Sequence, residues 1–222
     1  PVPEGADCVV IQEEVERRGK LITLLTEDTS KSNIRPAGQD FTLGDEMSAP
    51  RLLTPSDIAL AASMNHAELC VYKRPVVALV STGDELVQPG EAPADGQIIA
   101  SNTYGLKALL EAHGAEARIL PIARDNRSSL ETVFSLCEGA DLIITIGGAS
   151  VGDHDIVADV AESMGLDQSF YKVAMRPGKP LMAGRLGGRA MIGLPGNPVS
   201  AMVCGEIFVV PLIEKMLGLG VG

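Results

Sequence analysis

The chain has 222 residues, of which 45% are hydrophobic and 21% are charged, so its composition supports a packed core and argues against disorder. Its formal net charge is −11, and aromatic residues make up only 3% of the chain, with no Trp. A general role in binding nucleic acid or an anionic membrane is therefore disfavoured, because phosphate groups would be repelled and base-stacking platforms are scarce. An anionic small molecule would need a local basic patch or a metal ion.

The four cysteines, Cys8, Cys70, Cys137 and Cys204, are scattered singly among apolar neighbours without metal-ligand or CxxC spacing. We expect reduced core residues in a cytosolic protein. No apolar run reaches the ~18 residues of a membrane span, and no segment has the pattern of a signal peptide. The chain lacks an initiator Met and begins in a strand-like pattern, so we expect a piece of a longer protein.

The first 42 residues are predicted to be β-rich. Residues 6–15 and 20–27 cluster or alternate apolar side chains around a turn-like segment, and residues 32–40 have the composition of a loop. Residues 54–65 are predicted to form a helix, with Thr54 as N-cap, Pro55 at the first helical position and Asp57 in the first turn. This helix belongs to a connector.

From residue 75 onward, predicted strands alternate with predicted helices. The strands are expected at residues 75–80, 117–122, 141–146, 169–175, 181–186 and 189–194. The helices are expected at residues 101–114, 127–139, 156–165 and 197–217. This alternation predicts a three-layer α/β domain on a mostly parallel sheet.

Polar and glycine-rich segments follow the predicted strands. Because ligands of open α/β sheets bind beyond the carboxyl ends of the strands, we expect these segments to form one site. They contain Thr82, Gly83, Asp84 and Glu85; Arg124, Asp125 and Asn126; Gly147 to Asp155; Arg176, Gly178 and Lys179; and Pro195 to Ser200.

The segment DLIITIGGASVGDHD, residues 141–155, predicts a buried strand, a glycine loop and the start of a helix. Such a loop brings backbone N–H groups close to an anion and points a helix N-terminus at it. The loop lacks both the Gly-Lys-Ser/Thr ending of a P-loop and the GxGxxG of a dinucleotide fold. The sequence predicts an anion site without either of those mechanisms.

Four carboxylates in this set could hold a hard cation such as Mg²⁺, which accepts one or two carboxylates together with phosphate oxygens and waters: Asp84, Glu85, Asp125 and Asp155. Structural roles are the alternatives. Asp84 and Asp125 could bond the backbone of their own turns, and Asp153 or Asp155 could cap the next helix. Asp153 is the favoured cap, which leaves Asp155 for the site.

A basic set lies near the end of the chain. If the strand at residues 169–175 continues, Lys172, Ala174 and Arg176 share one face and form a cationic slot, with Lys179 nearby. An ordinary solvated strand face is the alternative. His154, the only histidine near the site, is interpreted as a bystander, and Met175, Met182, Met191 and Met202 as core residues. In the β segment, Arg35 and Asp40 are interpreted as a turn and a surface ion pair.

Seven motifs occur in the order found in the molybdopterin molybdenumtransferase family, which includes MoeA and the gephyrin E-domain. The chain resembles this family along essentially its whole length, through GADCVVIQEE, NIRPAGQD, STGDEL, SNT, GGASVGDHD, KVAMRPGKP and GLPGNPVSA. The resemblance implies a partial β-rich region at residues 1–42, a helical connector at 43–74, a molybdopterin-binding α/β domain at 75–218 and the start of a linker at 219–222.

The resemblance also implies a function. We expect a cytoplasmic homodimer that inserts molybdenum from molybdate into adenylylated molybdopterin and releases AMP, with Mg²⁺ as the divalent ion. The β-rich region of one subunit is expected to face the α/β cleft of the other. Molybdopterin adenylyltransferase is a further expected partner.

Functional residues of the family match positions of this chain. Catalytic roles are implied for Asp40, Glu85, Asp125, Asp155, Lys172 and Arg176, and metal binding for Glu85, Asp125 and Asp155. Arg176 occupies a position where Lys is frequent, and Gln39 one where an acid is common. Contacts to the pterin, phosphate or pyrophosphate are expected from Thr82, Gly83, Asp84, Gly147, Gly148, Ser150, Gly152, Lys179, Pro195, Gly196, Asn197 and Pro198.

The resemblance also implies that a further family Asp precedes Pro1 and that a C-terminal β domain with a serine motif follows Gly222, so this chain alone is expected to turn over little. Two other functions are alternatives. A molybdopterin adenylyltransferase shares the α/β fold, but its loop usually reads GGTG followed by Arg-Asp. A non-catalytic molybdopterin-binding scaffold would bind its ligand without releasing AMP.

Overall fold

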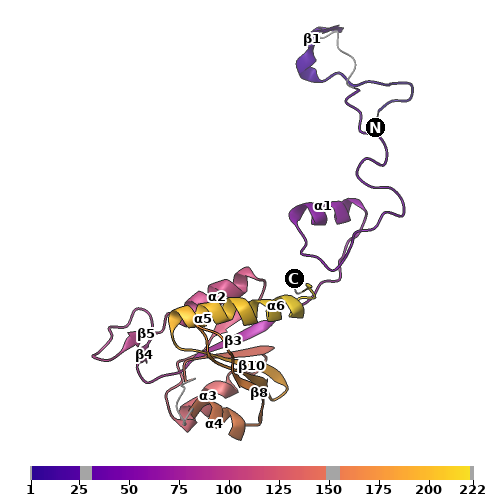
Figure 1. The fold of residues 1–222 in the computed structure, drawn as a ribbon. Helices are drawn as coiled ribbons and strands as arrows, with labels where there is room; N and C mark the ends of the chain where they lie inside the picture. Colours follow the sequence, from indigo (N-terminus) through magenta and orange to yellow (C-terminus); the bar gives the residue numbers. More distant parts are fainter. Residues whose placement is uncertain (1, 26–31, 149–155, 221–222) are drawn as a thin grey trace. The chain divides into compact units, whose positions relative to one another are not determined.

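A computed structural model describes residues 2–25, 32–148 and 156–220. The chain divides into two compact units, Pro1–Ala67 and Glu68–Gly222 (Figure 1). Each unit is described separately below. The finer division at residues 42, 74 and 218 stays a prediction. Among the described residues, no helix combines the length and the hydropathy that crossing a membrane would require.

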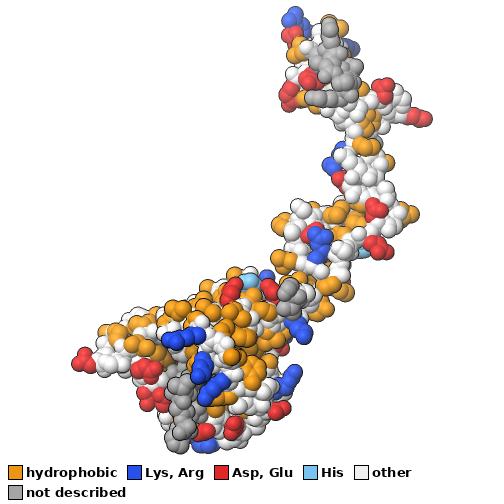
Figure 2. All heavy atoms as spheres, viewed as in Figure 1, with side chains coloured by type: hydrophobic (Ala, Val, Ile, Leu, Met, Phe, Trp, Pro, Cys, Tyr) orange, Lys and Arg blue, Asp and Glu red, His pale blue; other side chains and the backbone are white. Residues whose placement is uncertain are grey.

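The N-terminal unit contains a short 3-10 helix, η1 (Gln12–Glu14), and an antiparallel hairpin of β1 (Val15–Arg18) and β2 (Leu21–Leu24). Its apolar residues are largely exposed, Leu21 by 67% and Leu25 by 63% of their surface, and Figure 2 shows hydrophobic side chains on the surface of this unit. The predicted strand at residues 6–15 is wrong for residues 6–14, because β1 begins only at Val15, where β2 supplies a pairing partner.

The helix α1 (Pro55–Ser63) confirms the predicted connector helix and its cap. The Thr54 side chain accepts a hydrogen bond from the Asp57 N–H at 3.2 Å, and Asp57 Oδ2 accepts one from the Thr54 N–H at 2.8 Å. This reciprocal arrangement is a capping box, which satisfies backbone donors at the start of a helix. Together, the backbone N–H and the hydroxyl of Thr54 hold the pKa of Asp57 below its usual value.

The C-terminal unit is built on a six-stranded sheet in the order β6-β3-β7-β10-β9-β8. Its strands are β3 (Val76–Ser81), β6 (Glu116–Ile119), β7 (Leu142–Ile146), β8 (Leu166–Lys172), β9 (Pro180–Leu186) and β10 (Arg189–Leu194). Neighbouring pairs among β6, β3, β7 and β10 are parallel, whereas β9 runs antiparallel to both β10 and β8. The prediction of a mostly parallel sheet is confirmed.

Helices cover both faces of this sheet, which gives the three predicted layers (Figure 1). One face packs against α3 (Arg127–Ser135) and α4 (Ile156–Ser163), and the other against α2 (Asn102–Ala112), α5 (Pro198–Cys204) and α6 (Val210–Met216). Consecutive residues of β3 contribute to opposite clusters, Ala78 to the first and Leu79 to the second. A strand buried on both faces explains the continuous apolar runs in the sequence.

The structure of the C-terminal unit differs from the prediction in three main places. Strand β8 begins three residues before the predicted start and ends at Lys172, and the short parallel pair β4 (Leu86–Val87) and β5 (Ile98–Ile99) was not expected. The last helix is interrupted by a π-turn over Gly205–Val209, labelled η2, in which the N–H of Val210 donates to the Gly205 carbonyl. Pro211 has no N–H to continue the normal ladder, which accounts for the break.

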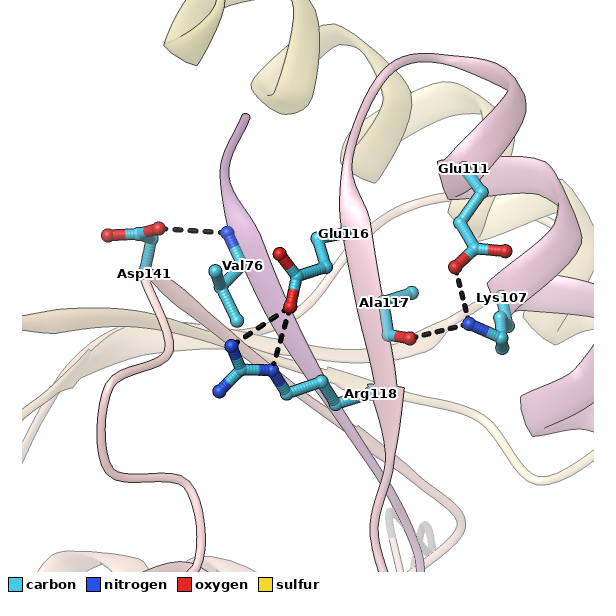
Figure 3. Close-up of polar contacts among 7 residues, drawn as sticks. All are labelled: Val76, Lys107, Glu111, Glu116, Ala117, Arg118 and Asp141. Carbon is cyan, nitrogen blue, oxygen red and sulfur yellow. Dashed lines mark hydrogen bonds and ion pairs between the residues drawn. The ribbon is translucent and has the colours of Figure 1, made fainter. Parts of the chain in front are cut away.

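The amino ends of the strands carry polar side chains that are used within the fold (Figure 3). Asp141 Oδ2 accepts a hydrogen bond from the Val76 N–H at 2.8 Å, and the Asp141 N–H returns one to the Val76 carbonyl, so Asp141 aligns β7 with β3. Lys107 donates to the Ala117 carbonyl at 2.7 Å and pairs with Glu111. This edge of the sheet is stabilised by contacts between its own groups.

All four cysteines lie in the described ranges, and no disulfide joins them. Burial at Cys137 and Cys204 confirms the predicted core role, and burial raises the pKa of the Cys137 thiol to about 11. The core prediction is wrong for Cys70, which is exposed in the segment before β3, and holds only in part for the half-buried Cys8. The four methionines predicted for the core, Met175, Met182, Met191 and Met202, all belong to the hydrophobic clusters.

Candidate functional site at the carboxyl edge of the sheet

The loops that follow β3, β6, β7, β8 and β10 meet at one edge of the sheet. The register supports this, because Ser81 pairs with Ile146 and Leu194 pairs with Ile146 from the other side. Strand β8 runs parallel to β10, since both are antiparallel to β9, and Lys172 at its end pairs with Pro180. The predicted convergence of polar loops therefore follows from the topology of the sheet.

Glycines allow three of these loops to pack closely. Gly147 has φ of +92°, and a Cβ there would lie 2.7 Å from the Thr82 carbonyl oxygen. A Cβ on Gly148 would lie 2.9 Å from Thr82 Oγ1, and one on Gly196 would lie 3.3 Å from Gly147 Cα. The loops after β3, β7 and β10 can approach this closely only because all three glycines lack a side chain.

Thr82 lies at the centre of this packing. It is 2% exposed, and its hydroxyl has no hydrogen-bond partner among the described residues. A buried hydroxyl without a partner is costly, because the group has lost water without gaining a replacement. Together with the adjacent glycines, this hydroxyl is suited to a polar ligand atom.

The acids after β3 and β6 interact across their two loops. The Asp84 N–H donates to Asp125 Oδ2 at 3.3 Å, and the Asp125 N–H donates to Asp84 Oδ1 at 3.2 Å. Glu85 lies against Gly83, where a Cβ would be 2.5 and 2.6 Å from the two Glu85 carboxylate oxygens. Each carboxylate thus bonds the backbone of the other loop, whereas the predicted alternative placed these bonds within each residue's own turn. Among the described residues, one oxygen of each carboxylate remains for another partner.

No cluster of three or more His, Cys, Asp or Glu side chains suited to a metal ion occurs in the part of the chain that the structure describes. Several predicted site residues lie outside the described ranges: Ser150, Gly152, Asp153, His154 and Asp155. The carboxylates of Glu85 and Asp125 are both exposed and lie on adjacent loops. Two exposed carboxylates fit a hard cation that completes its shell with water and phosphate oxygens.

Lys172 is the last residue of β8, and Arg176 and Lys179 lie on the loop that follows it. Strand β8 ends at Lys172 with irregular pairing at Phe170 and Lys172, and residues 173–179 turn back toward β9. The predicted strand is therefore wrong beyond Lys172, and the period of two no longer places Lys172, Ala174 and Arg176 on one face. Lys172, Arg176 and Lys179 are exposed, and Lys172 Nζ lies 5.3 Å from the centre of the Tyr171 ring.

The loop after β10 is fixed from two sides. Asn197 caps α5 by accepting a hydrogen bond from the Ser200 N–H at 3.1 Å, and Pro198 occupies the first turn, as predicted. Asn102, at the start of α2, donates from Nδ2 to the Gly196 carbonyl at 2.7 Å. Pro195 is buried, whereas Gly196, Asn197 and Pro198 are exposed.

In the N-terminal unit, Arg35 Nη2 lies 2.5 Å from Asp40 Oδ1. The predicted surface ion pair is confirmed. The catalytic role of Asp40 stays a prediction.

Two polar residues organise the site edge in ways that the sequence did not indicate. Arg124 donates to backbone carbonyls of the β3–β4 loop, and Asn102 joins α2 to the loop after β10. The sequence predicts only a helix cap at Ser101 or Asn102 and only a polar loop at Arg124. Contacts with partners 38 to 94 residues away leave no local signal in a sequence.

The fold and the glycine-rich edge define a class: a three-layer α/β domain with glycine-containing loops gathered at the carboxyl ends of its strands. Residues 78–215 match the model of a probable molybdopterin binding domain, and residues 1–65 match that of the MoeA N-terminal region, domains I and II. The chain belongs to the family of probable molybdopterin binding domains, and its resemblance to molybdopterin molybdenumtransferases is confirmed along its whole length.

Three curated relatives illustrate this similarity. Molybdopterin molybdenumtransferases of Haemophilus influenzae and Nostoc are 40% and 37% identical over 98% and 100% of this chain and over 54% and 52% of their own length. Molybdopterin molybdenumtransferase 2 of Mycobacterium tuberculosis is 36% identical over 99% of this chain and 56% of its own length. The chain thus spans about half the length of the curated relatives that it matches.

Solved structures of related proteins have a similar fold. The molybdopterin biosynthesis MoeA protein of Pyrococcus horikoshii superposes with a TM-score of 0.69 at 29% identity, covering 98% of this chain and 55% of that one. Molybdenum cofactor biosynthesis protein B has a TM-score of 0.50 at 14% identity, covering 67% of this chain and 97% of that one, and shares the fold alone.

Proposed function

We propose that this chain is part of a transferase of molybdenum cofactor biosynthesis, which inserts molybdenum from molybdate into adenylylated molybdopterin and releases AMP. The observation that carries the proposal is the edge formed by Thr82, Gly147 and Gly196, where three glycine-containing loops pack around a buried, unpartnered hydroxyl. Relatives named molybdopterin molybdenumtransferase at 34–40% identity support the choice of reaction.

We assign binding of the substrate to the carboxyl edge of the sheet, where the glycine-containing loops after β3, β7 and β10 meet. Backbone groups of Gly83, Gly147, Gly148 and Gly196, with the Thr82 hydroxyl, would contact the pterin and its phosphates, because the backbone N–H groups of glycine loops can approach an anion closely. The exposed loop after β8 would attract molybdate through Lys172 and Arg176, with Lys179 beside the phosphates. In the loop after β10, the Asn197 side chain already caps α5. Pro195 and Pro198 have no N–H to donate, so they would contribute to the shape of the binding surface rather than hydrogen bonds to the substrate.

The carboxylates are assigned to the divalent ion. Glu85 and Asp125, joined by Asp155, would hold Mg²⁺ through one or two direct contacts. When bound, the ion would offset negative charge on the departing phosphate. The Glu85 carboxylate would also cover one face of Gly83, which would limit the access of water to Gly83.

The assembly is proposed from the family. We assign a cytoplasmic homodimer. In it, Asp40 of one subunit, oriented by its 2.5 Å ion pair with Arg35, would complete the cleft of the other subunit. A separate enzyme, molybdopterin adenylyltransferase, would supply the substrate. Sedimentation of the protein at several concentrations tests the dimer, since a monomer at all concentrations would contradict it.

The direct test is molybdate-dependent release of AMP from adenylylated molybdopterin. It is measured for this chain, for the Haemophilus influenzae relative as positive control, and for a chimera in which this chain replaces the matching 220 residues of that relative. Release by the chimera is expected, with a loss of about 100-fold or more in Glu85→Gln. Glu111→Gln is the matched control, because Glu111 pairs with Lys107 at the opposite edge of the sheet (Figure 3).

Two results would contradict the proposal. An inactive chimera that still binds adenylylated molybdopterin would favour a non-catalytic binding module. Formation of adenylylated molybdopterin from ATP, without molybdate-dependent release of AMP, would favour the adenylyltransferase.

A further inference from the structure

Arg124 connects the two loops that carry Glu85 and Asp125. It follows β6, and its guanidinium nitrogen Nη1 donates to the carbonyls of Leu86 at 3.0 Å and Asp84 at 3.1 Å, with Gly83 at 3.4 Å. A nitrogen with two hydrogens makes two full hydrogen bonds, so the contacts with Asp84 and Leu86 are the principal ones.

The other backbone groups of the β3–β4 loop have fixed partners as well. The Glu85 carbonyl accepts from the Ile98 N–H at 2.8 Å, and the Gly83 N–H donates to the Ala123 carbonyl at 3.1 Å. The Asp84 N–H donates to the Asp125 carboxylate. Among the carbonyls of residues 83–86, those of Asp84 and Leu86 therefore depend on Arg124, and without it they would be left to water.

Arginine suits this task for a geometric reason. Its guanidinium is planar and permanently charged, and it can place several N–H groups on neighbouring acceptors, whereas lysine offers a single ammonium. Within the described residues, Arg124 has no carboxylate within 4.0 Å, so its charge is directed at carbonyl dipoles. Its backbone is fixed in turn, because the Arg124 N–H donates to Ser129 Oγ at 2.9 Å in α3.

We propose that Arg124 is a positioning residue, which holds the β3–β4 loop in the conformation that places the Glu85 carboxylate over Gly83 and keeps this loop bonded to Asp125. Arg124 itself acts through the backbone and makes no contact with substrate. The inference rests on the proposed function for what Glu85 and Asp125 do, but the loop conformation can be measured without it.

The first experiment measures amide hydrogen exchange in the 222-residue chain. Arg124→Ala is expected to raise exchange about 10-fold or more in peptides that cover residues 83–99, while peptides of β7 remain protected. Arg124→Lys is expected to give an intermediate effect. Arg118→Ala is the matched control, because this exposed arginine lies on β6 and its side chain donates to the Glu116 carboxylate (Figure 3).

The second experiment is a double-mutant cycle in the active chimera, with Arg124→Ala, Glu85→Gln and the combination. Arg124→Ala is expected to lower kcat by about 10- to 100-fold, as loss of a supporting group commonly does. If Arg124 acts through Glu85, the double variant releases AMP no more slowly than Glu85→Gln alone.

Three results would overturn the inference. The first is unchanged hydrogen exchange over residues 83–99 in Arg124→Ala, and the second is an unchanged kcat despite faster exchange. The third is a double variant in which the fold-losses in AMP release of Arg124→Ala and Glu85→Gln multiply. An inactive wild-type chimera would contradict the proposed function instead. The position of the Glu85 side-chain NMR signals in wild type and Arg124→Ala would then decide the inference, with a shift supporting it and coincident signals overturning it.

Discussion

Two buried threonines test what an unpartnered hydroxyl does in this fold. Thr82 and Thr145 are 2% and 1% exposed, and neither hydroxyl has a hydrogen-bond partner among the described residues. Valine has nearly the same shape without the polar atom, so Thr82→Val and Thr145→Val should each leave the free energy of unfolding unchanged or raise it by up to about 1 kcal/mol. Urea unfolding of the 222-residue chain measures this change.

The two variants should differ in ligand binding. Thr82 is surrounded by the glycines of the site edge, whereas Thr145 lies inside β7 and faces Gly193 of the neighbouring strand. Thr82→Val is expected to weaken binding of adenylylated molybdopterin by about 10-fold, the value of one hydrogen bond to a charged group, and Thr145→Val to leave it unchanged. Equal affinity in both variants would exclude the Thr82 hydroxyl as a ligand contact.

Gly147 allows a second comparison, because Gly165 has almost the same backbone conformation. Their φ values are +92° and +91°, but a Cβ on Gly147 meets the Thr82 carbonyl oxygen at 2.7 Å, whereas one on Gly165 meets nothing within 4 Å. Gly165→Ala should cost about 1–2 kcal/mol of stability from the left-handed backbone. Gly147→Ala should cost a further 1–3 kcal/mol or so, because the two loops must separate. Similar urea midpoints for the two variants would show that the close approach of the loops is not tight.

Among the elements, α1 should respond to acid through its capping box. Hydrogen bonds from the Thr54 N–H and hydroxyl lower the pKa of Asp57 in the folded chain. The carboxylate therefore stabilises α1 fully above its unfolded pKa of about 3.9, and this stabilisation is lost as pH falls through the lower folded value. Protection of the amides of residues 55–63, relative to Asp57→Asn at the same pH, should decrease between about pH 5 and pH 2.

The control for α1 is Asp95→Asn, which changes an exposed acid in the β4–β5 segment of the other unit. Its α1 amides should follow those of the wild-type chain at every pH. A pH profile of Asp57→Asn that matches the wild type would show that the capping box does not stabilise α1.

Elements with local signals could be predicted from the sequence, and contacts between distant segments could not. The residues that form the cap at Thr54 are close together in the sequence, as are the residues of the apolar run of β7, and the structure confirms both. The site edge followed from the alternation of strands and helices, because parallel strands bring their carboxyl ends together. The Arg124 contacts with Asp84 and Leu86 depend on the sheet order and were invisible.

Wrong predictions have the same origin. The face assigned to Lys172 and Arg176 assumed that β8 continues, but pairing with β9 ends at Lys172 and Pro180. The single helix predicted for residues 197–217 ignored Pro211, whose missing N–H accompanies a π-turn. Glycine also matters there, because a Cβ on Gly205 would lie 2.6 Å from Leu106 Cδ2 of α2.

At the scale of the whole molecule, the hydrophobic core belongs to the C-terminal unit. Both core clusters consist of residues between Val76 and Leu217, whereas only Asp57 and Ala61 are buried among the described residues of the N-terminal unit. A two-stranded hairpin with exposed apolar side chains is at best marginally stable alone. Most of the free energy of unfolding should therefore come from residues 68–222.

Removal of residues 1–67 tests this distribution. The chain 68–222 should unfold with a thermal midpoint within about 3 °C of the full chain, since a loss of 1 kcal/mol shifts the midpoint of a domain of this size by about 2–4 °C. Tyr fluorescence is a suitable probe, because the protein has no Trp and its three tyrosines, Tyr72, Tyr104 and Tyr171, all lie in the retained unit.

Removal of residues 210–222 is the contrasting control, because it deletes the buried Val210 and Ile213 of α6 and should abolish cooperative unfolding. A midpoint more than about 5 °C lower in the chain 68–222 would show that the N-terminal unit contributes to the stability of the α/β core.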